Sequence, residues 1–334
     1  MQATWNGRRV LITGHTGFKG SWLALWLQHL GAEVAGYALA PETEPSHFEL
    51  IALDQLVNHH QGDIRDIEKL RKVTSEFRPE VVIHMAAQAL VLRSYDQPKE
   101  TFDINIGGTV NVLEVVRELD SVSACIVVTS DKCYENKDFV WGYRENDRLG
   151  GSDPYSASKG AAEIVFEAYR RSVFQSGERQ IGLATVRAGN VIGGGDWAEY
   201  RIVPDCVRAL SAGRKIPVRN PQAVRPWQHV LEPLGGYLLL GQRLLTHPAE
   251  YSGAWNFGPG ASEAVRVEQL VNQFVKAWGS GAVELNSGDE QPRKEARVLR
   301  LCTDKARYDL DWSPILSGPE AISWTADWYQ AWHA

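Results

Sequence analysis

Five residues in the middle of the chain carry side chains that can move protons on a small substrate. Tyr155 and Lys159 are spaced i and i+4, so on a helix both project from one face. An ammonium beside a phenol lowers the pKa of the phenol, which suits a base that removes a hydroxyl proton while hydride leaves the same carbon. Ser130, Asp131 and Lys132 lie upstream and add a hydroxyl, an acid and an amine. Simple alcohol oxidation needs neither the acid nor the amine, so the set predicts a reaction in which oxidation is one of several steps.

A glycine-rich turn near the start of the chain predicts a dinucleotide site. The apolar run Val10–Thr13 is typical of a buried strand, and Gly14, Gly17 and Gly20 follow it at intervals of three. Such glycines permit a tight turn, close approach of backbone to a pyrophosphate and close helix–strand packing. The amphipathic helix expected from Phe18 would offer its free amides to the phosphates.

The residues after the second expected strand bear on the choice of nucleotide. A dinucleotide fold often places an acid there against the ribose hydroxyls. Here the stretch is Gly36–Ala40, the nearest acid is Glu42, and no arginine suggests a pocket for NADP. We therefore favour NAD. Asp63 is a candidate for holding the adenine, although it would equally suit the N-terminus of a helix.

Apolar strand patterns and amphipathic helix patterns alternate over the first half of the chain. Strands are expected at 10–13, 33–37, 81–85, 124–129 and 181–187, and helices at 18–30, 66–77, 101–119 and 154–174. This alternation favours an α/β fold with a doubly wound parallel sheet. After residue 189, glycines and prolines break the chain into shorter pieces, and helices return at 231–245, 267–278 and 319–332. We expect a cofactor-binding domain over 1–188 and a smaller, mainly substrate-binding lobe over 189–334, with about 228–258 returning to the first domain.

Composition narrows the class of protein. The 334 residues carry a net charge of -6, which argues against nucleic acid as a partner. The four cysteines form no CxxC pair, so we expect reduced thiols and no metal site. Arg8 and Arg9 run directly into a strand, without the apolar segment of a signal peptide. The apolar stretch 231–245 is too short to span a bilayer, so we expect no membrane segment and a cytoplasmic location.

Several motifs, in this order and spacing, resemble the extended short-chain dehydrogenase/reductase superfamily from residue 10 to about 190. They are Thr13–Gly20, His84–Gln88, Asn105–Thr109, Ser130, and Tyr155 with Lys159. Further features resemble one member family, the CDP-glucose 4,6-dehydratases, over nearly the whole chain. These are Asp131-Lys132, the segment Arg187–Trp197, and Arg225–Val230.

The resemblance implies a Rossmann domain with a C-terminal nucleotide-sugar lobe, NAD as a cofactor regenerated in each cycle, and a lyase of deoxysugar biosynthesis. It also implies a homodimer or homotetramer that pairs through the helices at 101–119 and 155–174. By position, the cofactor-binding places of the superfamily fall on Gly14, Thr16, Gly17, Phe18, Gly20, Asp63, Ile64, Ala86, Ala87, Gln88, Asn105, Tyr155 and Lys159.

The implied reaction converts CDP-D-glucose to CDP-4-dehydro-6-deoxy-D-glucose and water. Tyr155 would remove the 4-OH proton while Ser130 bonds that oxygen, and hydride would pass from C4 to NAD and back to C6. A neutral Lys132 would take the C5 proton, and a protonated Asp131 would give a proton to the departing 6-OH. Related dehydratases carry a glutamate at the position of Lys132, so the identity of the C5 base stays open. Both residues can reach the sugar only if the strand has ended at Ser130, because neighbours on a strand face opposite sides.

The second lobe must hold a nucleotide diphosphate. Arg225 and Arg201, with Arg293 behind them, are candidates for the diphosphate, and Asn190 for the sugar or a phosphate. The choice of cytosine rests on the resemblance alone. A nucleotide-sugar 4-epimerase or reductase would share the fold but would not need Asp131-Lys132. An NAD-sensing regulator is a further alternative, although such proteins often lose the tyrosine.

Overall fold

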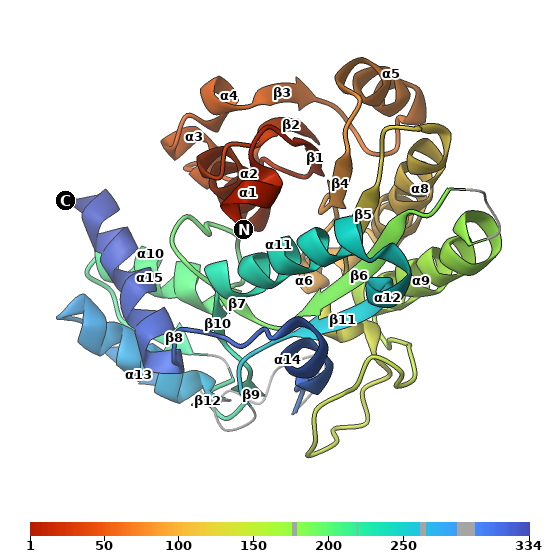
Figure 1. The fold of residues 1–334 in the computed structure, drawn as a ribbon. Helices are drawn as coiled ribbons and strands as arrows, with labels where there is room; N and C mark the ends of the chain where they lie inside the picture. The colour runs from red at the N-terminus through yellow and green to blue at the C-terminus, as the bar shows by residue number, and fades with distance from the viewer. Residues whose placement is uncertain (176–178, 219, 261–264, 286–297) are drawn as a thin grey trace. The chain divides into compact units, whose positions relative to one another are not determined.

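The computed structural model describes residues 1–175, 179–218, 220–260, 265–285 and 298–334 (Figure 1). The chain divides into two compact units, each with its own core. The first comprises Met1–Glu135, Glu145–Arg187 and Leu234–Trp255, and the second Asn136–Arg144, Ala188–Pro233 and Asn256–Ala334.

One seven-stranded sheet organises the first unit. In spatial order its strands are β11 (Gly253–Phe257), β6 (Gly182–Ala188), β5 (Ala124–Val128), β4 (Val81–His84), β1 (Arg9–Thr13), β2 (Glu33–Ala38) and β3 (Asn58–Gln61). The pairings from β3 through to β6 are parallel. The order β3-β2-β1-β4-β5-β6 is that of a Rossmann fold, which confirms the predicted doubly wound parallel sheet.

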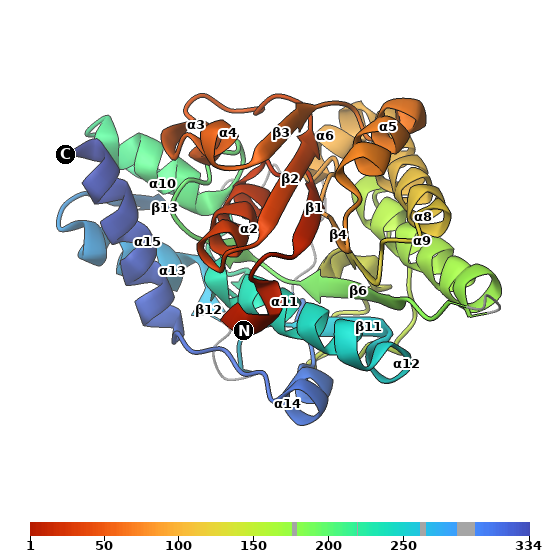
Figure 2. The ribbon, with the colours of Figure 1, turned by 45° about the horizontal axis from the view of Figure 1, so that its top comes forward.

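Helices cover both faces of this sheet (Figures 1 and 2). On one face lie α5 (Ile67–Phe77), α8 (Gly108–Glu118) and α9 (Pro154–Tyr169), and on the other lie α2 (Phe18–His29) and α11 (Leu231–Thr246). The first face buries a cluster that includes Leu11, Tyr37, Val82, Val127, Leu70, Val116 and Phe166. Each large apolar side chain buried in this way contributes about 1.5–3 kcal/mol, so the cluster holds the carboxyl ends of the strands in fixed register.

The helix expected over 101–119 is not continuous. The chain forms α7 (Pro98–Phe102), a π-helical turn (Asp103–Gly107) and then α8. Gly107 and Gly108 stand at the join, where two glycines weaken a regular helix. A Cβ at Gly108 would lie 2.6 Å from Ile64 Cγ2, so the bare residue lets the helix approach the loop after β3. The helix expected over 154–174 likewise ends in a π-helical turn, Arg170–Phe174.

The remaining helices of the first unit are short. They are α1 (Gln2–Trp5), α3 (His47–Leu50), α4 (Leu53–Leu56), α6 (Val91–Asp96) and α12 (Pro248–Tyr251).

The second unit is built from helices and short strand pairs. Its helices are α10 (Ile202–Ser211), α13 (Val267–Trp278), α14 (Asp304–Leu310) and α15 (Gly318–His333). The pairs are β7 (Val191–Ile192) with β10 (Gln228–His229), β9 (Val224–Arg225) with β12 (Val265–Arg266), and β8 (Ile216–Val218) with β13 (Val283–Leu285). The unit buries an aromatic-rich core that includes Trp197, Trp227, Phe274 and Tyr329.

Helix α10 was not expected, because Pro204 suggested a break in the chain. Pro204 is the third residue of α10 and therefore lies in its first turn, where the missing amide removes no intrahelical hydrogen bond.

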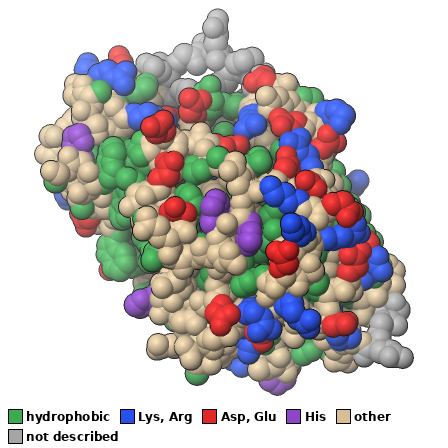
Figure 3. Space-filling view, turned by 90° about the horizontal axis from the view of Figure 1, so that it is seen from above, with side chains coloured by type: hydrophobic (Ala, Val, Ile, Leu, Met, Phe, Trp, Pro, Cys, Tyr) green, Lys and Arg blue, Asp and Glu red, His purple; other side chains and the backbone are tan. Residues whose placement is uncertain are grey.

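The structure shows where the cysteines and the charged side chains lie. The four cysteines are free, and Cys125, Cys133 and Cys206 are buried. On the face drawn in Figure 3, acidic and basic side chains lie interspersed. Within the described ranges, none of the helices combines the length and apolar character needed to cross a bilayer.

Candidate active site

The candidate catalytic segment, residues 129–134, begins where β5 ends. The strand stops at Val128, and Ser130 is the N-cap of a 3-10 turn formed by Asp131–Cys133. Ser130 Oγ accepts a hydrogen bond from the amide of Lys132 at 3.2 Å. Because the strand has ended before Ser130, the opposite-face geometry of neighbouring strand residues does not apply to Asp131 and Lys132. The condition that the sequence set for a shared site is therefore met.

Asp131 is buried but only partly satisfied. It is 4% exposed, and its Oδ1 accepts a hydrogen bond from Ser130 Oγ at 2.9 Å. Its Oδ2 is buried and has no hydrogen-bond partner in the part of the chain that the structure describes. Leaving a buried polar atom without a partner costs about 1–3 kcal/mol, so such an atom is suited to meet a ligand. The neighbouring Lys132 is half-buried, and its side chain makes no hydrogen bond or ion pair with the described residues.

Tyr155 and Lys159 lie near the start of α9. Asp153 caps this helix by accepting from the Ser156 amide at 2.9 Å, and the amide of Tyr155 donates to Ser94 Oγ at 3.2 Å. Lys159 is buried, and its Nζ donates to the carbonyl of Val128 at 3.4 Å. Burial lowers the pKa of Lys159 to about 8, against the opposing effects of Glu163 and Cys133. The structure therefore brings Lys159 to the end of β5, two residues before Ser130.

The glycine turn has the shape that a dinucleotide requires. A Cβ at Gly14 would lie 2.6 Å from the Ala86 nitrogen, and one at Gly20 would lie 2.1 Å from the Gly14 carbonyl oxygen. These two glycines let the turn pack on its neighbours. A Cβ at Gly17 would meet only the Gly14 oxygen, at 3.4 Å, and Gly17 is exposed. Gly17 is also the N-cap of α2 and provides no side-chain cap, so the start of this helix fits a diphosphate.

A buried histidine, His84, fixes the end of β1 that leads into the glycine turn. His84 Nδ1 lies 2.7 Å from Thr13 Oγ1, and its Nε2 lies 3.2 Å from Thr109 Oγ1. Burial, together with the charge of Lys159, lowers the pKa of His84 to about 3. The neutral ring thus joins β1, β4 and α8. Thr16 adds a further hydrogen bond within the protein, because its Oγ1 donates to the Leu39 carbonyl at 2.9 Å. Phe18 is the first residue of α2.

Two residues expected to bind the cofactor lie after β3, and Asp63 is the one expected to hold the adenine. Both carboxylate oxygens of Asp63 accept hydrogen bonds from Arg65, which holds the pKa of that carboxyl below its usual value. The N-cap of α5 is Asp66, so the alternative of Asp63 as a helix cap is wrong. Ile64 is buried in the core. A ligand that uses the Asp63 carboxylate would share it with Arg65, and the adenine role stays a prediction.

Asn105 connects the loop after β4 to α9. Its Oδ1 accepts from the Gln88 amide at 2.9 Å, and its Nδ2 donates to the Gln88 carbonyl at 3.1 Å and to Ser158 Oγ at 2.8 Å. Both amide hydrogens of Asn105 are thus used within the protein. The residue positions the loop that carries Ala86 and Ala87, while direct contact with a cofactor stays a prediction.

The candidates for substrate binding belong to the second unit. Asn190 is half-buried, and its side chain makes no hydrogen bond with the described residues. Arg201 pairs with Asp196 at 2.9 Å, and the buried Arg225 donates to the carbonyl of Val224 at 2.9 Å. Arg293 lies outside the described residues.

A buried ion pair next to the candidate catalytic segment was not predicted from the sequence. Glu163 and Arg187 are 2.7 Å apart, and each side chain is 3% exposed. Glu163 follows Lys159 by four residues and Tyr155 by eight, so all three lie on one face of α9. This spacing was the available signal, because a charged residue on a buried helix face requires a partner.

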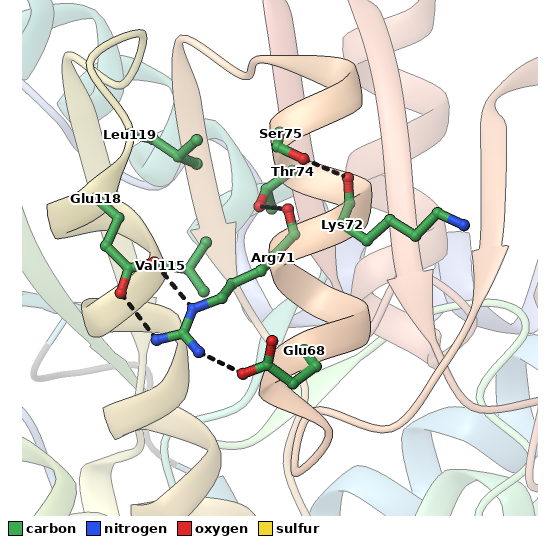
Figure 4. Close-up of a pocket in the computed structure, with 8 residues that line it drawn as sticks. All are labelled: Glu68, Arg71, Lys72, Thr74, Ser75, Val115, Glu118 and Leu119. Atoms are coloured by element: carbon green, nitrogen blue, oxygen red, sulfur yellow. Dashed lines mark hydrogen bonds and ion pairs between the residues drawn. The ribbon is translucent and has the colours of Figure 1, made fainter.

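A surface depression between α5 and α8 lies apart from these residues. It is lined by Glu68, Arg71, Lys72, Thr74, Ser75, Val115, Glu118 and Leu119. Figure 4 shows that Arg71 reaches across it to Glu118 on α8, at 2.8 Å, and also pairs with Glu68 on its own helix, at 2.5 Å. None of the predicted site residues lines it.

The sheet order, the glycine turn and the Tyr155–Lys159 pair together define an extended short-chain dehydrogenase/reductase. The chain belongs to the GDP-mannose 4,6-dehydratase family, whose model matches residues 11–324. It is 51% identical over 331 residues to a CDP-glucose 4,6-dehydratase of Salmonella typhimurium, covering 98% of this chain and 92% of that protein. It is 31% identical to a CDP-paratose 2-epimerase of Salmonella typhi, covering 96% and 98% of the two chains. These matches confirm the resemblance that the sequence motifs indicated.

Solved structures share the fold. A UDP-glucose 4-epimerase of Thermotoga maritima superposes with a TM-score of 0.82 at 23% identity, covering 98% of this chain and 100% of that one. A dTDP-glucose 4,6-dehydratase of Streptomyces venezuelae gives 0.82 at 22% identity, covering 97% of both. At this level of identity the likeness shows the fold, and epimerases and dehydratases match it equally well.

Proposed function

We propose that the protein converts CDP-D-glucose to CDP-4-dehydro-6-deoxy-D-glucose and water, with NAD as a cofactor regenerated in each cycle. The observation that carries the proposal is Asp131, a buried acid directly beside Ser130 with one oxygen for which the described residues provide no partner. An epimerase does not need an acid at this position, whereas loss of water needs one to protonate the leaving hydroxyl. The identity of 51% to a CDP-glucose 4,6-dehydratase supports the choice of substrate.

The first step is the removal of the 4-OH proton by Tyr155. The ammonium of Lys159 stabilises the phenolate, and the hydroxyl of Ser130 hydrogen-bonds the sugar oxygen. NAD, when bound, would supply the acceptor for the C4 hydride and the donor of that hydride to C6. Gly17 and the first amides of α2 would hold its diphosphate, while Gly14 and Gly20 let the turn pack closely.

The second step is the loss of water across C5 and C6. The new C4 ketone acidifies the C5 proton, which Lys132 in its neutral form removes. Asp131 in its protonated form donates to the departing 6-OH, and its position next to Ser130 places this donor one residue from the group that binds the 4-oxygen. C5 is then reprotonated, so atoms and electrons balance without net oxidation.

The test is mass analysis of CDP-D-glucose incubated with the purified protein and NAD in catalytic amount. We expect the sugar nucleotide to lose one water while no reduced nicotinamide accumulates. If the mass stays unchanged and chromatography shows an epimer, the dehydratase proposal fails. If UDP-glucose or dTDP-glucose loses water and CDP-glucose does not, the reaction stands and the choice of cytosine is wrong.

Lys132→Ala tests the assignment of the C5 base. We expect NAD binding to remain and water loss to fall by about 10²- to 10⁴-fold, as for removal of a general base. Exposed Lys72 on α5 provides the matched control, since Lys72→Ala removes the same charge and should keep full turnover. Full turnover by Lys132→Ala would transfer the base role to another group.

We also propose that the protein works in the cytoplasm as a homodimer or homotetramer paired through α8 and α9. The free thiols fit a reducing compartment, and Ile164 on α9 is 60% exposed, which is unusual for a large apolar side chain. Sedimentation of Ile164→Glu should give a smaller species than the wild type. An unchanged sedimentation coefficient would exclude this helix pair as the interface.

A further inference from the structure

A single buried carboxylate connects three elements around the catalytic segment. Glu163 on α9 accepts hydrogen bonds from Thr129 Oγ1, from Thr185 Oγ1 at 2.8 Å, and from Arg187 Nε and Nη2 at 2.8 and 2.7 Å. Thr129 is the residue directly before Ser130. The first residue of the catalytic segment is therefore fixed to the helix that carries Tyr155 and Lys159.

Arg187 holds the other end of the same segment. Its Nη1 donates to Tyr134 Oη at 2.6 Å and to the Glu145 carbonyl at 3.0 Å. Tyr134 directly follows the 3-10 turn that contains Asp131 and Lys132. The Glu163–Arg187 pair thus fixes both ends of residues 129–134, and the catalytic side chains lie between the two attachment points.

The pair also contributes to the charge around Lys159. The groups that act on this ammonium are Glu163 on α9, Cys133 on the 3-10 turn next to Asp131, and His84 on β4. His84 is neutral above a pH of about 3, and burial raises the pKa of Cys133, so near neutral pH Glu163 is the negative charge among these three. Tyr155 is about two helical turns from Glu163 on the same face of α9, with Lys159 between them.

We infer that Glu163, held by Arg187, is a positioning residue of the reaction. It fixes Ser130, Asp131 and Lys132 relative to Tyr155 and Lys159, and its charge sets the pH range in which the Tyr155–Lys159 pair works. The inference rests on the proposed function for the roles of these catalytic residues.

Two threonines provide a matched test of the geometric part. Thr129 and Thr185 both donate to Glu163, but Thr129 adjoins Ser130, whereas Thr185 lies within β6. Thr129→Val and Thr185→Val each remove one hydrogen bond to Glu163 and keep the shape and the charge; Thr129→Val also removes the longer contact of Thr129 Oγ1 with the Val186 carbonyl, at 3.4 Å. We expect similar decreases in Tm, with kcat falling about tenfold or more in Thr129→Val and less than about twofold in Thr185→Val. Equal kcat values in the two variants would overturn the positioning role.

The electrostatic part is tested by Glu163→Gln and Glu163→Asp. Removing the negative charge disfavours protonation of Lys159 and of Tyr155, so the profile of kcat against pH should shift to lower pH by about 0.5–1 unit in Glu163→Gln. Glu163→Asp keeps the charge but shortens the side chain, so kcat should fall while the profile stays in place. A Glu163→Gln profile at the wild-type position would show that the carboxylate serves packing alone.

A measurement without substrate separates this inference from the proposed reaction. Tyrosine ionisation, followed by ultraviolet difference spectra against the matching Tyr155→Phe variants, reports the titration of Tyr155 directly. We expect Glu163→Gln to lower that titration point whether or not CDP-D-glucose is the substrate. An unchanged titration point overturns the electrostatic role, whereas a shifted one with no turnover of CDP-D-glucose places the error in the proposed function.

Discussion

Two buried carboxylates in the first unit differ in what surrounds them. Glu163 is 3% exposed and accepts four hydrogen bonds, two of them from Arg187. Asp131 is 4% exposed and accepts one, from Ser130, while its second oxygen has no partner in the described ranges. A satisfied buried carboxylate stabilises the structure around it, whereas an unsatisfied one costs stability. The contrast supports our proposal that Glu163 belongs to the framework of the site and that Asp131 acts on the substrate.

Asp131→Asn is the sharpest test of this contrast and has the largest expected effect. The amide keeps the shape but cannot deliver a proton, so kcat should fall by about 10²- to 10⁴-fold. Because Asp131 Oδ2 has no partner to lose among the residues that the structure describes, Tm should stay the same or rise slightly. Steady-state kinetics and thermal melts on the same preparation measure both quantities. A large drop in Tm would mean that Asp131, like Glu163, supports the fold.

Arg187→Met tests the opposite member of the comparison. Methionine fills much of the same volume but leaves Glu163 without its ion-pair partner. Breaking a buried pair from one side costs about 3–5 kcal/mol, because the remaining charge stays buried. For a chain of this size we expect Tm to fall by roughly 4–7 °C. A decrease of less than about 2 °C would show that water or a new partner compensates Glu163.

Lys159→Met examines a buried charge that forms no ion pair with a carboxylate of the described residues. Burial lowers the pKa of Lys159 from 10.5 to about 8, so the folded state binds this proton less tightly than the unfolded state. The resulting loss of stability is fully present below pH 8 and disappears as the pH rises toward 10.5. Lys159→Met should therefore be more stable than the wild type at pH 7 by about 2–3 kcal/mol, and the difference should shrink between pH 8 and 10.5. Chemical denaturation across this range measures it; a constant difference would show that Lys159 is not destabilised by its charge.

The first half of the fold was predictable because its local patterns agree with its tertiary structure. The runs that form β1, β5 and β6 are buried on both faces, as strands of a covered parallel sheet must be. The glycine turn and the spacing of Tyr155 and Lys159 are equally local signals, and the structure places both as expected.

The framework of the site was not predictable from local patterns. Glu163 meets Thr129, Thr185 and Arg187 only after three elements come together, so the pairing lies in the tertiary structure. Packing likewise determines the π-helical turn at Asp103–Gly107. It also determines that Asn136–Arg144 belongs to the second unit, although the residues on both sides of it belong to the first. The substrate candidates Arg201 and Arg225 were chosen by charge alone, which is why the sequence did not reveal that Arg201 pairs with Asp196.

The depression between α5 and α8 contains exposed ion pairs that can be compared with the buried Glu163–Arg187 pair. Arg71 pairs there with two carboxylates, whereas Arg187 pairs with Glu163 (Figure 4). The side chains of Arg71, Glu118 and Glu68 are 36%, 37% and 78% exposed. Water screens such pairs and solvates whatever remains after one partner is removed. Arg71→Met should therefore change Tm by less than about 2 °C and leave kcat unaltered, in contrast to Arg187→Met. Repeating both melts in 1 M salt sharpens the test, because screening should remove the small effect of Arg71→Met and leave the large effect of Arg187→Met. Equal shifts in the two variants would mean that burial is not what separates the two arginines.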